Sequence, residues 1–171
     1  MDLAYTETQL MLLEVAREFV ANEAPKGRVR EIDDGADGFS MELWRQMADL
    51  GLQGMAVPDS LGSTASTLMD YAMVFEALGE GATPSPLLAN AFAAYLMTEL
   101  GAAPQDLRTI ATGEQLSVVA LTEPDYGWEE PFVQATATET TSGFQISGTK
   151  SFVPYAAVAD VLLVIARSKA G

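Results

Sequence analysis

The chain has 171 residues, of which 49% are hydrophobic and 19% charged, so it can bury a core and shows no compositional tendency to disorder. It contains neither cysteine nor histidine, which excludes disulfides, thiolate chemistry and imidazole bases from this chain. The net charge of −15 repels phosphate backbones, so we expect no binding to nucleic acid. Because no apolar run is long enough to span a membrane and no basic leader begins the sequence, we expect no membrane span and a cytoplasmic location.

The first part of the sequence has apolar residues at helical spacing, separated by residues that favour helix ends. Thr6 is expected to cap a first helix, which stops at Pro25 and Gly27. Ser40 is expected to cap a short second helix that stops at Gly51. These signals predict an N-terminal region built from helices.

The helical pattern continues for another sixty residues. Thr67 followed by Asp70 is typical of a capping box and predicts a helix start. Ser85 and Pro86 predict the start of an alanine-rich helix that runs to Leu100, and a last short helix is expected over 105–111. The helical region therefore ends near Gly113.

From Leu116 onward the apolar pattern changes to a period of about two residues, which is typical of strands. Strands are expected over 116–122, 132–140, 144–147, 150–153 and 161–166. Glu123 is interpreted as a turn residue before Pro124, and Lys150 as a hairpin residue with a solvated ammonium group. Asp160 is expected to cap a turn before the last strand.

Three motifs in this second part occur in a recognisable order. They are Leu-Thr-Glu-Pro at 121–124 with Gly127, Ile-Ser-Gly-x-Lys-x-Phe-Val at 146–153, and Ala-Asp-x-Leu-Leu-Val-Ile-Ala-Arg at 159–167. Together with the helical segments 39–62 and 70–90, they resemble the acyl-CoA dehydrogenase family over essentially the whole chain. Each motif is moderately specific, and their combined order and spacing are strong evidence.

The resemblance implies an α+β fold class. Residues 1–114 would form the family's N-terminal all-α helical domain, and 115–171 the first part of an antiparallel β-barrel-like middle domain. That second domain would be incomplete, and the family's C-terminal helical domain would be missing. Because 161–166 would leave an apolar strand at a sheet edge, we expect either a fragment or a second chain that completes the sheet.

The resemblance also implies a chemistry. In the family, bound FAD accepts a hydride from the β-carbon of an acyl-CoA thioester while a glutamate removes the α-proton, which gives a trans-2-enoyl-CoA. That glutamate belongs to the C-terminal domain, so the catalytic residue of this enzyme is unknown here and the chain alone is expected to be inactive. The implied partners are an acyl-CoA substrate, an electron-transfer acceptor and a homo- or hetero-oligomer. The implied role is fatty acid or steroid side-chain degradation, and no metal site is expected.

The family's flavin-contacting segments map onto two parts of this sequence. The backbone and hydroxyl of Thr122 are suited to hydrogen-bond the flavin edge, and Phe152 is suited to stack on or enclose the ring. The expected cofactor-binding residues are Val119, Leu121, Thr122, Trp128, Phe152, Val153 and Pro154.

Two of these positions depart from the family pattern. Trp128 follows Gly127 where the family has a serine, and Pro154 replaces a hydroxyl residue and removes a backbone donor. Losing two ordinary hydrogen bonds could weaken FAD binding by about one to two orders of magnitude. The departures therefore favour an alternative, in which the chain is a non-catalytic partner subunit of a heteromeric acyl-CoA dehydrogenase. A third possibility is an acidic helical interaction protein without a cofactor.

Overall fold

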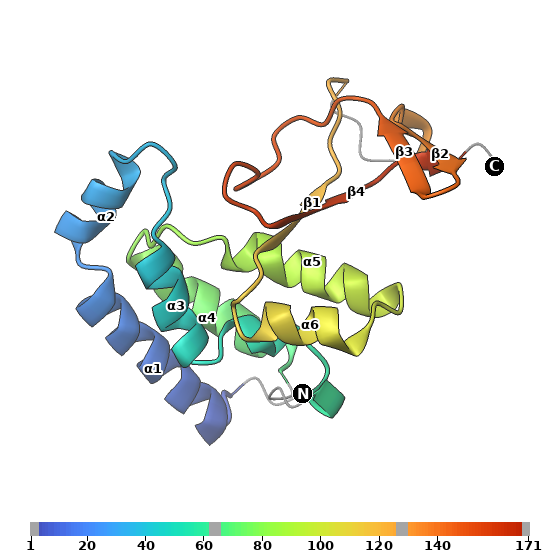
Figure 1. Cartoon of the computed structure of the whole chain (residues 1–171). Helices are drawn as coiled ribbons and strands as arrows, with labels where there is room; N and C mark the ends of the chain where they lie inside the picture. Colours follow the sequence, from blue (N-terminus) through green and yellow to red (C-terminus); the bar gives the residue numbers. More distant parts are fainter. Residues whose placement is uncertain (1–3, 62–65, 126–129, 169–171) are drawn as a thin grey trace.

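A computed structural model of the chain describes residues 4–61, 66–125 and 130–168. The helices form one bundle and the strands lie along one side of it (Figure 1). The α-helices are α1 (Glu7–Glu23), α2 (Lys26–Asp33), α3 (Met41–Asp49), α4 (Leu68–Glu80), α5 (Leu87–Glu99) and α6 (Pro104–Ala111). The strands are β1 (Ser117–Ala120), β2 (Thr136–Thr140), β3 (Gly143–Ser147), β4 (Val161–Val164) and β5 (Arg167–Ser168). Short 3₁₀ helices are η1 (Gln53–Ala56), η2 (Asp59–Leu61) and η3 (Glu130–Phe132).

The predicted capping residues begin their helices. The Thr6 hydroxyl accepts a hydrogen bond from the backbone N–H of Gln9 over 3.2 Å, and the Gln9 side chain accepts one from the Thr6 N–H over 3.0 Å. Thr67 and Asp70 make the same reciprocal pair at the start of α4. The Ser40 hydroxyl accepts from the third helical N–H of α3. The three predicted helix starts are therefore confirmed. They were predictable because each cap bonds a partner only three residues away.

Three segments differ from the sequence prediction. The strand expected over 132–140 begins only at Thr136, because residues 130–132 form η3. Helix α2 was not expected, because Pro25 was interpreted only as a stop for α1. A proline's fixed φ and missing N–H also suit the entry to a helix, and Pro25 stands at the N-cap of α2 with a φ of −62°. The strand expected over 150–153 does not form, because Phe152 has a left-handed backbone with a φ of +52°.

The main core lies between the helices and the first strand. Trp44 and Leu87 are essentially buried there with Val118 of β1. The Trp44 indole N–H donates to the carbonyl of Gly113 over 2.9 Å, which fixes the chain where it leaves the helices. Since a strand residue shares the core of the helices, β1 is anchored directly on the helical bundle.

The strands form two small sheets of mixed direction. β1 pairs in parallel with β4, β2 pairs antiparallel with β3, and β2 pairs in parallel with β5. The α+β class is confirmed, but the expectation of wholly antiparallel pairing is wrong for β1–β4 and β2–β5. Asp160 aligns the first pair: its carboxylate accepts from the Leu116 N–H over 2.8 Å, and its own N–H donates to the Leu116 carbonyl over 2.9 Å.

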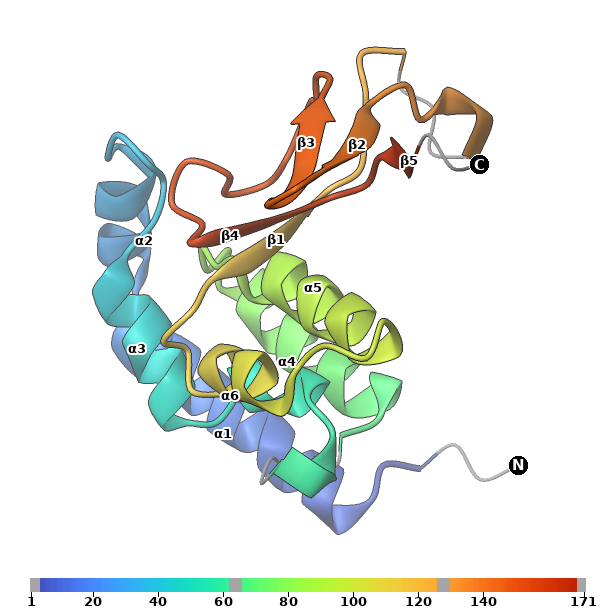
Figure 2. The same cartoon turned by 45° about the vertical axis from the view of Figure 1, so that its right-hand side comes forward.

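The first sheet connects the second to the helices. Figure 2 shows β1 and β4 lying across α5, with β2 and β3 on the side away from the helices. None of the helices in the described ranges is long and apolar enough to cross a membrane.

Candidate functional site

Two motif segments that lie far apart in the sequence meet beyond the end of β1. The backbone N–H of Ser151 donates to the carbonyl of Thr122 over 2.8 Å. This bond places Thr122 next to the segment that carries Phe152. The structure therefore brings together the two stretches that the sequence analysis assigned to flavin contact.

A buried ion pair lies directly beneath this meeting point. Glu123 is 4% exposed. Its carboxylate accepts hydrogen bonds from the backbone N–H groups of Gln134 over 2.8 Å and Ala135 over 2.9 Å. The Lys150 ammonium lies 2.7 Å from the same carboxylate and also donates to the Leu121 carbonyl over 3.1 Å. The interpretation of Glu123 as a simple turn residue and of Lys150 as a solvated residue is therefore wrong.

The environment of Glu123 stabilises its charged form. The hydrogen bond from Lys150 and then the one from the Ala135 N–H lower the pKa of the Glu123 carboxyl to about 2, against the opposing effect of burial. The Glu123 carboxylate is thus ionised at neutral pH, and it already accepts hydrogen bonds from three donors. It is suited to hold three chain segments together and is unsuited to accept a proton from a substrate.

The chain passes closely around this pair at Gly148. A Cβ atom on Gly148 would lie 2.6 Å from the Cβ of Ala135, which is too close for any real side chain. Because the Ala135 N–H is bound by Glu123, the glycine allows the 148–150 segment to approach the carboxylate.

The predicted cofactor residues differ widely in exposure. Val119 is 9% exposed within β1, whereas the Phe152 side chain is 76% exposed. Leu121, Thr122 and Val153 are half-buried, and Pro154 is exposed. Trp128 lies outside the described residues.

Thr122 offers unused hydrogen-bonding groups. Within the described ranges, neither its backbone N–H nor its hydroxyl has a hydrogen-bond partner. Both groups stand at the point where the β1–β4 ladder ends, since the last ladder bond runs from the Ile165 N–H to the Ala120 carbonyl over 3.2 Å. A half-buried donor and hydroxyl without partners are suited to receive a polar ligand edge.

The segment after Lys150 is held in an unusual backbone conformation. Phe152 and Tyr155 both have left-handed φ values, +52° and +57°. Each such non-glycine position costs on the order of 1–3 kcal/mol and persists where the surroundings enforce it. Tyr155 is half-buried against the core that contains Leu87, and burial raises the pKa of its phenol. The strained segment is thus packed against the helical core.

An apolar groove runs between α4 and α5. It has a volume of about 760 Å³, and its lining includes Tyr71, Phe75, Leu88, Ala91, Phe92 and Tyr95. A smaller hollow of about 260 Å³ shares Phe75 and Leu88 with the groove and also contacts Ser85. The hollow therefore extends the groove along α5 as far as Ser85.

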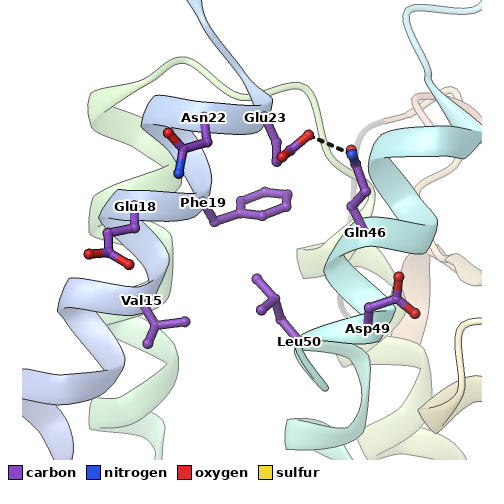
Figure 3. A pocket seen from close by; sticks show the side chains of 8 residues that line it. All are labelled: Val15, Glu18, Phe19, Asn22, Glu23, Gln46, Asp49 and Leu50. Carbon is purple, nitrogen blue, oxygen red and sulfur yellow. Dashed lines mark hydrogen bonds between the residues drawn. The ribbon is translucent and has the colours of Figure 1, made fainter.

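A separate hollow of about 300 Å³ lies between α1 and α3 (Figure 3). Val15 and Phe19 of α1 face Leu50 across it, and the Gln46 amide donates to the Glu23 carboxylate over 2.5 Å. None of its lining residues belongs to the two motif segments, so it is not part of the candidate site.

Glu123, Lys150 and Tyr155 are the structural residues of the site that the sequence analysis missed. One signal was present for the ion pair. In a chain with 9 basic and 24 acidic residues, a lysine between apolar strands is a candidate partner for a buried acid. No local signal indicates that Tyr155 packs against the core, because that contact depends on how the loop lies against the helices.

Comparison with known proteins identifies the family of the helical part of the chain. Residues 6–113 match the family described as "Acyl-CoA dehydrogenase, N-terminal domain". The chain is 28% identical over 171 residues to the "Probable acyl-CoA dehydrogenase YdiO" of Escherichia coli strain K12, covering 98% of this chain and 44% of that protein. The chain therefore spans less than half the length of this relative.

Solved structures share the fold over the same range. The "ChsE4-ChsE5 complex from Mycobacterium tuberculosis" superposes with a TM-score of 0.85 at 28% identity, covering 100% of this chain and 47% of that one. The "FAD complex of PigA" superposes with a TM-score of 0.79 at 27% identity, covering 98% of this chain and 45% of that one. With the matched N-terminal domain filling most of its length, this chain belongs to the acyl-CoA dehydrogenase family.

Proposed function

We propose that this chain supplies the N-terminal part of an FAD-dependent acyl-CoA dehydrogenase, which desaturates an acyl-CoA thioester between its α- and β-carbons. Residues 1–114 would be the helical domain and 115–171 the beginning of the β-domain. The observation that carries the proposal is the hydrogen bond from Ser151 to Thr122, which joins the two segments expected to contact the flavin. The proposal includes a cytoplasmic location, an oligomeric enzyme and an external electron acceptor.

The donor set beside this bond fits FAD. The N–H and hydroxyl of Thr122 are available to the acceptor atoms along one edge of an isoalloxazine ring. Phe152 presents an exposed aromatic side chain at the same place. Val119 and Leu121 would support Thr122 from the strand, while Val153 and Pro154 would flank the ring beside Phe152. When bound, FAD would supply a two-electron acceptor.

The groove between α4 and α5 is a suitable site for the acyl chain. Its apolar lining would remove hydrocarbon from water, and the smaller hollow that shares Phe75 and Leu88 extends it to Ser85. In this arrangement the chain binds and orients the acyl group, and the shape of the groove would limit its length.

The proton-abstracting base is not assigned to this chain. Glu123 is near the proposed flavin site, but it is buried and paired, and its lowered pKa opposes protonation. The chain matches 44% of the length of its relative, so we propose that the base comes from polypeptide beyond these residues and that the chain alone is inactive.

A second candidate is a non-catalytic subunit of a heteromeric acyl-CoA dehydrogenase. Pro154 favours it, because proline cannot donate a backbone hydrogen bond to the flavin. Trp128 favours it as well, from the sequence alone. The ChsE4-ChsE5 structure supports such an arrangement by its description as a complex of two proteins.

The two candidates separate in a titration with FAD. The purified chain should quench FAD fluorescence and acquire the visible flavin bands, and Thr122→Val should bind FAD more weakly because it lacks the hydroxyl. A chain that stays colourless alone, and turns yellow only with a co-expressed partner, would support the second candidate. A chain that binds no FAD under either condition would overturn both.

A further inference from the structure

We propose that Glu123 and Lys150 are positioning residues for the cofactor, which hold the Thr122 and Phe152 segments at the spacing that FAD requires. The inference rests on the proposed function and extends it to two side chains that a bound flavin need not touch. Their side chains are 5% and 9% exposed, so they act from beneath the site.

The contacts of the pair converge on both segments. Lys150 binds the carbonyl of Leu121, the neighbour of Thr122, and lies two residues before Phe152. Glu123 follows Thr122 directly and binds Lys150 over 2.7 Å. One ion pair therefore fixes the two sides of the proposed flavin edge relative to each other.

Glu123 also connects this edge to a third segment. Its two bonds to the N–H groups of Gln134 and Ala135 hold the chain that leads into β2. A carboxylate that accepts from two successive backbone N–H groups and an ammonium has a nearly fixed orientation. Because the Glu123 carboxylate is held by two backbone N–H groups, it fixes in turn the position of the Lys150 ammonium that binds it.

The left-handed backbone at Phe152 requires contacts on either side that hold it in place. A left-handed phenylalanine persists where its surroundings enforce it, and Phe152 has a φ of +52°. On its N-terminal side the chain is held by Lys150, which binds the Leu121 carbonyl, and by Ser151, which binds the Thr122 carbonyl. On its C-terminal side Val153 and Tyr155 pack against the helical core. Loss of the Lys150 tether should release Phe152 toward ordinary backbone conformations.

The pair is separate from the core that stabilises the helices. The largest buried side chains of that core include Trp44, Leu43 and Met47, and none of them contacts the pair through a hydrogen bond. Removing the ammonium should therefore loosen the site more than it unfolds the chain.

The test compares Lys150→Met with wild type and with Thr6→Ala, which removes a helix cap at the far end of the molecule. Lys150→Met is the milder way to break the pair, because Glu123 keeps its two backbone donors. Three quantities are measured for each protein: the urea midpoint of the cofactor-free chain, its hydrogen exchange over 119–124 and 149–154, and its dissociation constant for FAD. Glu123→Gln and the double variant complete a mutant cycle.

We expect Lys150→Met to raise hydrogen exchange in both segments and to raise the FAD dissociation constant about tenfold or more. Thr6→Ala should lower the urea midpoint and leave both of those readouts unchanged. The double variant should bind FAD no more weakly than the worse single variant, because the two residues act as a unit.

Two results would overturn the proposal, and the first of them does not depend on FAD. One is unchanged exchange over 149–154 in Lys150→Met, which would contradict the tether itself. The other is raised exchange with an FAD dissociation constant equal to that of wild type, which would contradict its role in binding. Failure of the wild-type chain to bind FAD would instead overturn the proposed function, while the exchange experiment would still decide whether the pair orders the two segments.

Discussion

The side-chain oxygen of Asn90 on α5 accepts a hydrogen bond from the backbone N–H of Ser117 at the start of β1, over 3.0 Å. Both residues are fully buried. This bond joins the helical part of the chain to its first strand at the point where the apolar period changes. It also satisfies a strand N–H that faces a helix instead of a neighbouring strand.

Replacing Asn90 with leucine should therefore destabilise the chain although the volume is kept. The substitution leaves the Ser117 N–H buried without an acceptor, which costs about 1–3 kcal/mol. Urea denaturation followed by circular dichroism would measure the change. Asn22→Ala on the exposed face of α1 is the control and should change stability by less than about 0.5 kcal/mol. Equal losses in the two variants would contradict the role assigned to Asn90.

Gly113 and Gly101 allow the cost of backbone conformation to be separated from the cost of packing. Their φ values are nearly the same, +71° and +70°. A Cβ on Gly113 would lie 2.8 Å from the Cβ of Ala48, whereas a Cβ on Gly101 would meet nothing within 4 Å. Gly101→Ala should cost about 1–2 kcal/mol for the left-handed backbone. Gly113→Ala should cost about 1–3 kcal/mol more because it overpacks the core. Similar unfolding free energies for the two variants would contradict this account.

The features that were predictable from the sequence are those with local causes. Thr6 and Thr67 begin helices because each bonds a residue three positions later, and the change of period near Gly113 follows from side chains on successive residues. The Glu123–Lys150 pair joins residues 27 positions apart, and a single charged side chain is ordinarily solvated, so neither residue revealed its burial.

Phe152 illustrates how tertiary contacts override a local pattern. Its neighbours have the composition of a strand, yet the backbone there is left-handed. The family resemblance assigned this segment and Thr122 to the same ligand, and the bond from Ser151 to Thr122 brings the two segments together. Lys150 beside it contacts Leu121 and Glu123, which are distant in sequence, so no local pattern could indicate this backbone conformation.

Stability should depend on pH through Glu123. Its pKa is lowered from an ordinary value of 4.5 to about 2 in the folded chain, so folding favours the ionised form. The stabilisation is complete above the unfolded pKa and is lost as the pH falls through the window from 4.5 to about 2. Urea midpoints measured across that window should fall more steeply for wild type than for Glu123→Gln, which cannot titrate. Parallel curves for the two proteins would show that Glu123 does not contribute.

The groove between α4 and α5 gives a prediction about ligand length. Ala91 lines the groove, so Ala91→Phe should fill part of its 760 Å³ and exclude a long hydrocarbon chain. The dissociation constant for a long-chain acyl-CoA should rise about tenfold, a typical penalty for a ligand that must displace an added ring. Acetyl-CoA, whose acyl group is too short to enter the groove, should bind with unchanged affinity. Isothermal titration calorimetry on the chain with FAD present would measure both constants, and Ala21→Phe on the exposed side of α1 provides a control of matched size. If Ala91→Phe weakened the two ligands equally, the groove would not be where the acyl chain lies, because only a site along the hydrocarbon can discriminate between them.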